Sequence, residues 1–314
     1  MKLKHVFDPH PCPICKSNER ELFIETIDRH YNIKGNWKIG KCCNCDLVQL
    51  VPMLSAQDLI KLYPEEEYYA YDISKHKQLL KKFLKKIFVP TLLVKDPKFD
   101  KPGNILDYGC GTGWALLNFK NKGWDCTGIE PSRIASMIGR EQLHLEIFEG
   151  TFHTIDDNLI NKKFDYIRAN HSLEHDPDID KTIHKFFDHL SSSGKILIGV
   201  PNINSFPFKL FKKYWWYLGA PVHTYNFSTK HLESLLNKNG FDVLKVRYCG
   251  NYTGILGSIQ MYFNRNKPNQ NPLNGFIFNF PLFIIVAQLF AFIFNLFQLG
   301  DAIEVTAQKK KNVL

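Results

Sequence analysis

A predicted strand at residues 105–108 runs directly into a glycine-rich turn, and this junction limits the possible folds more than any other feature. Glycines occupy positions 109, 111 and 113, and a helix is predicted for residues 114–120. Such a turn after a first parallel strand lets a ligand approach the backbone closely. The dinucleotide-binding fingerprint would require glycine at position 114, where this chain has Trp. Asp107 would repel a pyrophosphate, but it could hold a cationic amino group.

Alternating strand and helix patterns follow the turn. The second strand ends in Glu130, a carboxylate placed where it could accept hydrogen bonds from both hydroxyls of a ribose. Helical segments separate the strands, as a doubly wound parallel sheet requires. The strands predicted after the glycine turn are Asp125–Glu130, Leu145–Phe148, Phe164–Asn170, Lys195–Val200, Phe241–Tyr248 and Asp301–Gln308.

Four short runs, taken in order, carry a family resemblance: LDYGCGTG, GIEPS, NHSLEHDPD and IGVPN. The larger part of the chain thereby resembles the class I S-adenosylmethionine-dependent methyltransferases, within the small-molecule group that includes the ubiquinone-biosynthesis type. The resemblance implies an α/β fold with a Rossmann-like seven-stranded sheet, whose last two strands pair antiparallel at one edge. It places the methyltransferase domain at residues 101–314, with an apolar helical insertion at 250–299 before the last strand.

The resemblance also implies which residues bind the cofactor, S-adenosyl-L-methionine. They come from the glycine turn and from the carboxyl ends of the strands that follow it. Residue by residue, they are Asp107, Gly109 and Gly111 at the methionine end, Glu130 at the ribose, Gly150 and Thr151 at the adenine, Asn170 and His171 at the sulfonium, and Tyr108, Trp114 and Pro131 around them.

Histidines near the carboxyl edge of the sheet are candidates for a general base. A hydroxyl nucleophile needs a base whose pKa lies near the working pH, and histidine suits that task. His171 follows the fourth strand, and His223 precedes a Phe-Ser pair at which Ser228 is predicted to cap a helix. We expect His171 or His223 to act as the base. Glu174 and His175 are candidates for helpers or divalent-metal ligands, and packing or capping is the alternative for each histidine.

Two CxxC pairs lie near the N-terminus with short predicted strands between them. Four thiolates at this spacing suit a structural Zn²⁺. A closed site of four cysteines has no open coordination position, so the metal would stabilise a zinc-ribbon-like module at residues 1–55 rather than catalyse. This module resembles the zinc-binding leader of some sugar and polysaccharide-cluster methyltransferases. Cys43 is an extra thiol, and reduced cysteines without metal are the alternative. The four predicted ligands are Cys12, Cys15, Cys42 and Cys45.

Positive charge is in excess: the chain has 40 Lys and Arg against 31 Asp and Glu, a formal net charge of +9. Part of the excess lies in a helical connector at residues 56–100, where Ser74–Val89 combines an apolar stripe with lysines on the other face. One interpretation is a helix packed on the sheet with a solvated basic face. The other is a helix that contacts anionic lipid or phosphate groups.

The segment Phe276–Leu299 has no charged residue and is long enough to span a bilayer. Four amides and Pro281 interrupt it, and a single crossing would separate the last strand from its sheet. The alternatives are peripheral membrane contact through 276–299, a buried helix or homodimer contact, and true spanning. Because residues 1–20 lack the apolar core of a signal peptide, we expect a cytoplasmic chain. Surface docking would place it at the inner face of the membrane.

These patterns together predict an enzyme. We expect an S-adenosylmethionine-dependent O- or C-methyltransferase that acts on a small or lipid-linked molecule, such as a sugar intermediate of surface polysaccharide. The alternative is an rRNA or tRNA methyltransferase whose zinc module and basic helix grip phosphates. Base-amino methyltransferases carry an Asn/Asp-Pro-Pro-aromatic motif after the fourth strand, whereas this chain has Asn170-His-Ser-Leu. That difference counts against amino methylation of adenine or cytosine, and it leaves methylation at a guanine ring nitrogen of RNA, or at carbon, open. A non-catalytic scaffold is the third hypothesis.

Overall fold

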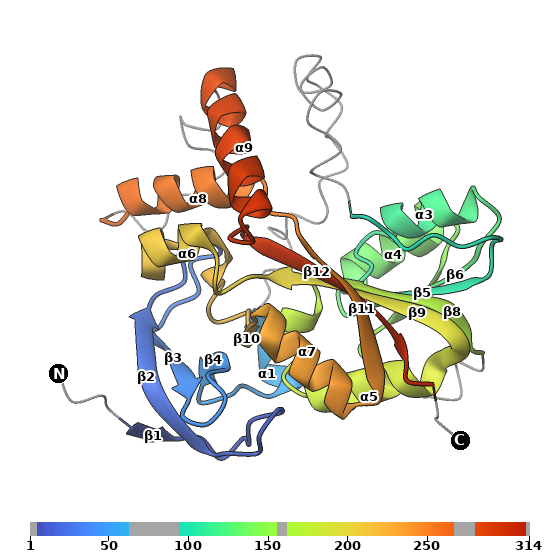
Figure 1. The fold of residues 1–314 in the computed structure, drawn as a ribbon, viewed down its shortest axis with the longest axis horizontal. Helices are drawn as coiled ribbons and strands as arrows, with labels where there is room; N and C mark the ends of the chain where they lie inside the picture. Colours follow the sequence, from blue (N-terminus) through green and yellow to red (C-terminus); the bar gives the residue numbers. More distant parts are fainter. Residues whose placement is uncertain (1–4, 63–93, 156–161, 267–279, 312–314) are drawn as a thin grey trace.

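The computed structural model describes residues 5–62, 94–155, 162–266 and 280–311. The basic helix predicted at 74–89 and the first residues of the 276–299 segment lie outside these ranges. Within these ranges the chain forms two sheets (Figure 1). The smaller sheet includes a short strand, β10, from the part of the chain that otherwise forms the larger sheet.

The larger sheet has seven strands in the order β11-β12-β9-β8-β5-β6-β7. Strands β5 to β9 pair in parallel. Strand β12 runs antiparallel to both of its neighbours, β9 and β11. The predicted Rossmann-like sheet with an antiparallel closing pair is thereby confirmed. The seven strands are β5 (Asn104–Tyr108), β6 (Asp125–Glu130), β7 (Glu146–Glu149), β8 (Phe164–Asn170), β9 (Leu190–Pro201), β11 (Phe241–Tyr248) and β12 (Ala302–Lys309).

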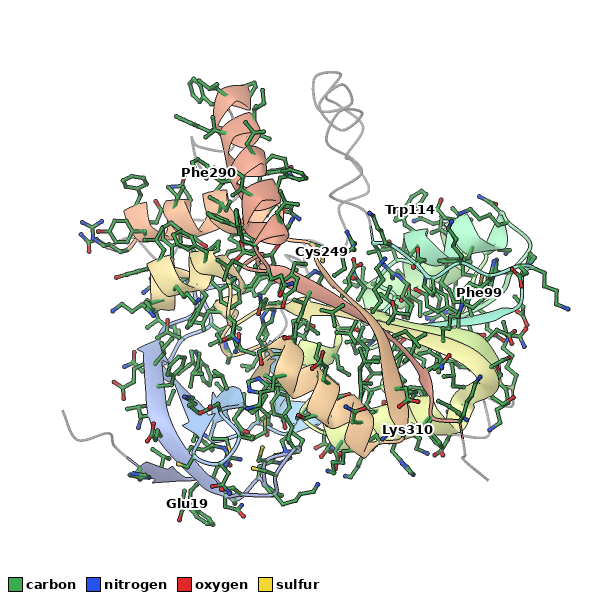
Figure 2. The ribbon with its side chains drawn as sticks, viewed as in Figure 1. Glu19, Phe99, Trp114, Cys249, Phe290 and Lys310 are labelled. Atoms are coloured by element: carbon green, nitrogen blue, oxygen red, sulfur yellow. The ribbon has the colours of Figure 1, made fainter. Side chains whose placement is uncertain are left out.

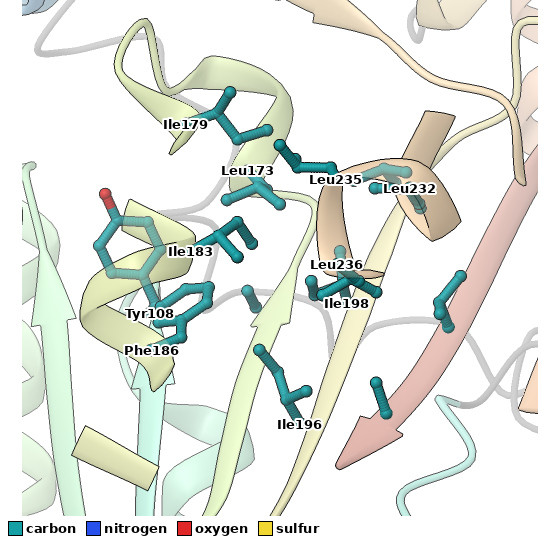
Figure 3. Close-up of a cluster of buried hydrophobic side chains, with 14 of the residues drawn as sticks. Tyr108, Leu173, Ile179, Ile183, Phe186, Ile196, Ile198, Leu232, Leu235 and Leu236 are labelled. Atoms are coloured by element: carbon teal, nitrogen blue, oxygen red, sulfur yellow. The ribbon is translucent and has the colours of Figure 1, made fainter. Parts of the chain in front are cut away.

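Helices cover both faces of this sheet because alternate side chains of each buried strand point in opposite directions. On one face Ile105 and Leu197 pack with Leu116 of α3 (Trp114–Lys120), beside Phe99 (Figure 2). On the other face the next residues in each strand, Leu106 and Ile198, join a cluster with helices α5 and α7 (Figure 3). The remaining helices around the sheet are α4 (Arg133–Leu143), α5 (Ile179–His189) and α7 (Thr229–Lys238).

Serine side chains cap the first turns of helices α4 and α7. The Ser132 hydroxyl accepts a hydrogen bond from the Ala135 amide at the start of α4. Ser228 caps α7 by accepting from the His231 amide, and the His231 side chain accepts from the Ser228 amide in return. The predicted cap at Ser228 is confirmed. Both caps satisfy amides that the first helical turn leaves without backbone partners.

The N-terminal residues form a smaller, five-stranded antiparallel sheet that also includes a strand from the methyltransferase region. Its strand order is β1-β2-β3-β4-β10. The last strand pairs through Tyr225 with Gln49 and through Asn226 with Val48. The cysteine region therefore shares its sheet with residues far along the chain. The strands are β1 (His5–Phe7), β2 (Glu19–Thr26), β3 (Trp37–Cys42), β4 (Val48–Val51) and β10 (Tyr225–Asn226).

Among the described residues between β11 and β12, where the apolar insertion is predicted, there are two helices. They are α8 (Tyr252–Phe263) and α9 (Pro281–Leu296). Helix α8 also packs near α6 (Phe206–Phe211), and the three helices gather at one end of the molecule (Figure 1). Among the described residues, no helix combines the length and the apolar character needed to cross a membrane.

Candidate cofactor and acceptor site

The glycine turn brings backbone, rather than side chains, to the carboxyl end of β5. Gly109 has a φ of 72°, which side-chain-bearing residues rarely adopt. A Cβ atom at this position would also lie 2.4 Å from the Cβ of Ser172, which is too close for any side chain. Position 109 therefore requires glycine, and the turn leaves its backbone open to a ligand.

Glu130 ends β6 directly beside this turn. One of its carboxylate oxygens accepts a hydrogen bond from the Gly111 amide at 2.8 Å, and the other accepts from the Ser132 amide at 2.9 Å. Burial raises the pKa of Glu130 to about 7, although these two amide donors act in the opposite direction. The carboxylate is thus held in a fixed position, and its charge changes near neutral pH.

A cavity of about 360 Å³ opens at this edge of the sheet, a size suited to a small-molecule ligand. The turn, the end of β6 and the segment after β8 all contribute to its wall. Other predicted cofactor residues lie outside this lining: Asp107, Gly111, Trp114, Gly150 and Asn170. The predicted residues that do line the cavity are Tyr108, Gly109, Glu130, Pro131, Thr151 and His171.

Asp107 is fully engaged within the protein. Its side chain is 1% exposed, and Nη1 of Arg168 lies 3.0 and 2.9 Å from its two oxygens. Burial raises the pKa of Asp107, and the Arg168 guanidinium opposes that shift. Within the protein, the Asp107 carboxylate is therefore already paired with a cation, and its assignment to the amino group of the cofactor stays a prediction. The signal for this pair was an arginine between Ile167 and Ala169 in strand β8.

Several lining residues were not predicted from the sequence. Helix α1 (Ala56–Leu62) supplies Ala56, Leu59 and Ile60 as an apolar wall. Such a short helix, far from the glycine turn in sequence, carries no local signal for this role. The other lining residues without a prediction are Ser132, Arg133, Ile134, Glu149, His153, Ser172, Asp176 and Pro177.

Asp176 organises the floor of the cavity. Its carboxylate accepts hydrogen bonds from the Tyr108 hydroxyl at 2.8 Å and from the Thr182 hydroxyl at 2.5 Å, and it lies 3.3 Å from Nε2 of His153. Burial opposes ionisation, but these hydrogen bonds lower the pKa of Asp176. Tyr108 is held in turn by stacking on Phe152 at 5.3 Å between ring centroids. The network fixes the tyrosine that lines the cavity.

The candidate base His171 stands at the mouth of this cavity. Its side chain is 40% exposed, and Nδ1 lies 3.3 Å from Oε1 of Glu174. The imidazole also stacks against Tyr217, with 5.9 Å between ring centroids. A φ of 54° directs residue 171 out of the sheet as β8 ends. The structure therefore places the exposed imidazole against a buried carboxylate that can orient it.

The other candidate, His223, lies deeper and beside His175. Nδ1 of His223 is 2.9 Å from the Tyr217 carbonyl, and Nδ1 of His175 is 3.0 Å from the Val222 carbonyl. Burial lowers the pKa of His223 to about 3 and that of His175 to about 4. Both rings are therefore neutral at physiological pH. A base whose pKa lies this far below the working pH has little driving force for accepting a proton.

Glu174, His175 and His223 also form a group that could bind a divalent cation. One ligand atom from each lies within 4.8 Å of the others. Oε2 of Glu174 is buried and has no hydrogen-bond partner among the described residues. The backbone carbonyls at Nδ1 of the two histidines resemble the outer-shell contacts that orient metal-binding imidazoles.

The four predicted zinc ligands converge, whereas Cys43 is exposed on the surface. Sγ of Cys12 lies 3.4 Å from that of Cys45, and Sγ of Cys15 lies 3.4 Å from that of Cys42. A tetrahedral site with Zn–S bonds of about 2.3 Å needs sulfur atoms roughly 3.8 Å apart, close to this geometry. A hydrogen bond from Cys45 lowers the pKa of Cys12 to about 5, despite burial. The cluster fits a zinc module.

The cysteine cluster is connected to the candidate acceptor site by backbone hydrogen bonds. The Cys45 carbonyl lies 3.2 Å from Nε2 of His231 in the α7 capping box. The Leu50 amide donates to the Thr224 carbonyl, and the Thr224 amide donates to the Glu174 carbonyl. A change at the cysteines can therefore alter the position of the segment that carries Glu174.

Comparison with known proteins agrees with this geometry. A family model described as a methyltransferase domain matches residues 67–246. The chain belongs to this methyltransferase family. Its seven-stranded sheet has the class I arrangement, with the glycine turn after the first strand of that sheet in the sequence, β5.

Curated relatives resemble a part of the chain. An uncharacterized methyltransferase from Staphylococcus carnosus is 32% identical over 98 residues, which are 31% of this chain and 46% of that protein. One from Alkaliphilus oremlandii is 34% identical over 103 residues, which are 31% of this chain and 45% of that protein. The chain thus spans less than half the length of these relatives.

A solved structure also resembles the chain. The crystal structure of a SAM-dependent methyltransferase from Archaeoglobus fulgidus is 20% identical with a TM-score of 0.45, covering 73% of this chain and 93% of that one.

We predict that substitutions of the adjacent cysteines 42 and 43 differ in their effects on zinc content and thermal stability. Cys42→Ser should lose the bound zinc and unfold at a lower temperature, because structural zinc contributes on the order of 10 kcal/mol in small zinc-binding peptides. Cys43→Ser should keep both the zinc and the melting temperature. Zinc content measured by atomic absorption and thermal unfolding followed by circular dichroism check this. Equal zinc content in the two variants would disprove the four-cysteine site.

The pKa of Glu130 predicts opposite pH effects on stability and binding. It lies above the ordinary value of 4.5, so the folded chain holds a proton that the unfolded chain releases. The contribution of Glu130 to stability therefore decreases as the pH rises from 4.5 through about 7. Affinity for S-adenosylmethionine should instead increase about tenfold between pH 6 and 8, because ionised Glu130 accepts the ribose hydroxyls.

Calorimetric titration across this pH range measures the effect. Glu130→Gln should bind weakly at every pH and lose the dependence, whereas Glu141→Gln, an exposed control on α4, should retain it. An unchanged pH slope in Glu130→Gln would assign the titration to another group.

Proposed function

We propose that this chain transfers a methyl group from S-adenosylmethionine to an oxygen or carbon atom of a small or lipid-linked acceptor. The observation that supports this most is the meeting of Gly109, Glu130 and His171 around one cavity of about 360 Å³. The glycine backbone and the carboxylate suit an adenosyl cofactor, and the histidine stands at the mouth where an acceptor would enter. The fit rests on these residues and on the family to which the chain belongs.

Bound S-adenosylmethionine supplies an electrophilic methyl group and leaves as S-adenosylhomocysteine. The protein's task is to position the acceptor in line with that methyl group and to remove a proton. We assign proton removal to His171, whose exposed imidazole is oriented by Glu174 at 3.3 Å. As the acceptor oxygen forms its bond to the methyl carbon, its proton passes to this imidazole. The carbon–sulfur bond breaks, and its electron pair stays on sulfur.

The charge of the cavity favours a small or lipid-linked acceptor over RNA. The lining contains no lysine among the described residues, and Arg133 is its one arginine there. Lysines gather instead in a groove at the opposite, amino end of the strands, with Lys98, Lys101 and Lys195. An RNA-modifying enzyme would need phosphate-binding cations around the reactive cleft. The cysteine module, which resembles the leader of some sugar methyltransferases, favours a sugar intermediate of surface polysaccharide.

The substrate class can be tested by measuring S-adenosylhomocysteine release with different candidate acceptors at matched concentrations. Nucleoside diphosphate sugars and polyprenyl-linked sugars should support turnover, whereas tRNA and rRNA transcripts should not. Turnover with RNA that weakens steeply as salt is raised would establish the RNA alternative instead.

The assignment of the base predicts different results for the two histidines. His171→Asn should lower the methyl-transfer rate about 100-fold or more while S-adenosylmethionine affinity is kept, because proton transfer of this kind contributes ~10²–10⁴ in rate. His223→Asn should change the rate less under the base mechanism. Single-turnover rates across a pH range, with binding measured separately, check this. A larger rate loss in His223→Asn than in His171→Asn would overturn the assignment.

A second mode of action is favoured by the unpartnered Oε2 of Glu174. A divalent cation held by Glu174, His175 and His223 would bind the acceptor hydroxyl and lower its pKa. Mn²⁺ titration followed by electron paramagnetic resonance is the test, because zinc in the cysteine cluster is silent. Tight Mn²⁺ binding that His223→Gln abolishes, and that the exposed control His184→Gln keeps, supports this mode. Absence of tight binding to the unsubstituted chain excludes it.

A further inference from the structure

Helix α9 is attached by one narrow face and exposed on the others. The face toward α8 is formed by Ala287, Gln288 and Ala291, which are at most 3% exposed. The remaining sides carry large apolar side chains that are 41–66% exposed, and Phe290 projects from the helix in Figure 2. A contiguous surface of this kind is unusual for a protein surrounded only by water. The exposed side chains are Leu282, Phe283, Val286, Leu289, Phe290, Phe292, Ile293 and Leu296.

The amides of this helix turn inward, so they do not interrupt its exposed apolar surface. Oε1 of Gln288 accepts a hydrogen bond from the Tyr252 amide. The Asn295 side chain bonds both the amide and the carbonyl of Gly250, each at 2.8 Å. These contacts fix α9 at the start of α8 and satisfy the polar groups internally. The exposed side of the helix consists of hydrocarbon and aromatic rings.

Cations and aromatic rings lie on α8 and on the 206–214 segment that packs against α8. Tyr262 of α8 packs against Tyr214, with 5.5 Å between ring centroids. The Arg265 guanidinium lies 4.9 Å from the Tyr262 ring, and Nζ of Lys213 lies 5.5 Å from the Tyr214 ring. Lys209 and Lys212 are exposed beside them. The segments 205–218, 251–265 and 280–298 contain no Asp or Glu.

We propose that helices α8 and α9 dock on an anionic lipid surface. The apolar side chains of α9 would enter the boundary between headgroups and acyl chains, and the tyrosines and cations would lie at headgroup level. With 16 residues, α9 is about 24 Å long, shorter than the ~30 Å hydrocarbon core. The docking is therefore peripheral. Juxtamembrane lysines add attraction to anionic headgroups.

The charge pattern favours lipid over a second copy of the chain. A two-fold dimer brings the same surface of both subunits together. Lys209, Lys212 and Lys213 would then face a surface of the same positive charge, with no carboxylate in these three segments to pair with them. Anionic headgroups provide that missing negative charge.

The docking surface is directly joined to the candidate acceptor site. The Trp216 amide donates to the Ser258 hydroxyl of α8, and Tyr217, the next residue, stacks against His171. Just beyond the C-terminal end of α9, the Asp301 carboxylate accepts a hydrogen bond from Nε1 of Trp215. Docking would thus hold the acceptor side of the enzyme close to the bilayer. This surface stands independently of the proposed reaction, because it consists of residues outside the cavity.

Co-sedimentation with vesicles tests the apolar part of this surface. The full chain should bind vesicles of equal parts phosphatidylglycerol and phosphatidylcholine. The variant Phe290→Ser with Ile293→Ser should weaken binding about tenfold for each side chain lost from the lipid. Leu244→Ser, an equally exposed position on β11, should bind as the unsubstituted chain does. Circular dichroism and S-adenosylmethionine affinity, unchanged in all variants, show that each is folded.

A second variant, in which Lys209, Lys212 and Lys213 are all replaced by Gln, tests the contribution of charge to vesicle binding. This variant should lose the preference for phosphatidylglycerol and most of the salt dependence. Equal binding of the unsubstituted chain to phosphatidylcholine alone would overturn the anionic requirement. Failure to bind either vesicle, together with a concentration-dependent dimer in light scattering that Phe290→Ser abolishes, would assign the surface to a second copy.

Discussion

Thr224 is fully buried. Its hydrogen bonds join the cysteine-bearing sheet to the segment that carries Glu174. Its carbonyl accepts from Leu50 of β4, while its amide and hydroxyl both donate to the carbonyl of Glu174. Strand β10 begins at the next residue and completes the cysteine-bearing sheet. The geometry of Glu174, and through it the orientation of His171, therefore depends on contacts made by the first fifty residues. The cysteine module is thus part of the structure that supports the candidate acceptor site.

Burial and charge are balanced differently at the two carboxylates near the glycine turn. Asp107 is neutralised by Arg168 from the neighbouring strand, so its charge is already compensated inside the protein. Glu130 has only backbone amides as donors, and burial raises its pKa to about 7. The carboxylate without a cation is the one that lines the cavity. A ligand that offers hydroxyl donors can therefore improve the environment of Glu130 more than that of Asp107.

Local sequence patterns predicted the strands of the large sheet and the position of the glycine turn, because each of these features is encoded by residues that are close together in the sequence. The predicted bounds of β6, β8, β11 and helix α3 agree with the structure, and β5 begins one residue earlier than predicted. The contribution of α1 to the cavity, the pairing of β10 with β4 and the pair Asp107–Arg168 did not follow. Each joins residues that are distant in sequence, and tertiary packing, which a local pattern does not record, decides such contacts.

The apolar insertion shows why composition alone left three alternatives open. Gln288 and Asn295 count as polar interruptions when the segment is taken as a string of letters. In the folded chain both side chains face inward, where they bond the backbone of Tyr252 and Gly250. The same amides that disfavour a span are the groups that attach α9 to the domain. Because α9 is attached through one face only, its opposite side exposes phenylalanine side chains. Through α8, which binds the Trp216 amide, this apolar side is held at a fixed position relative to the candidate acceptor site.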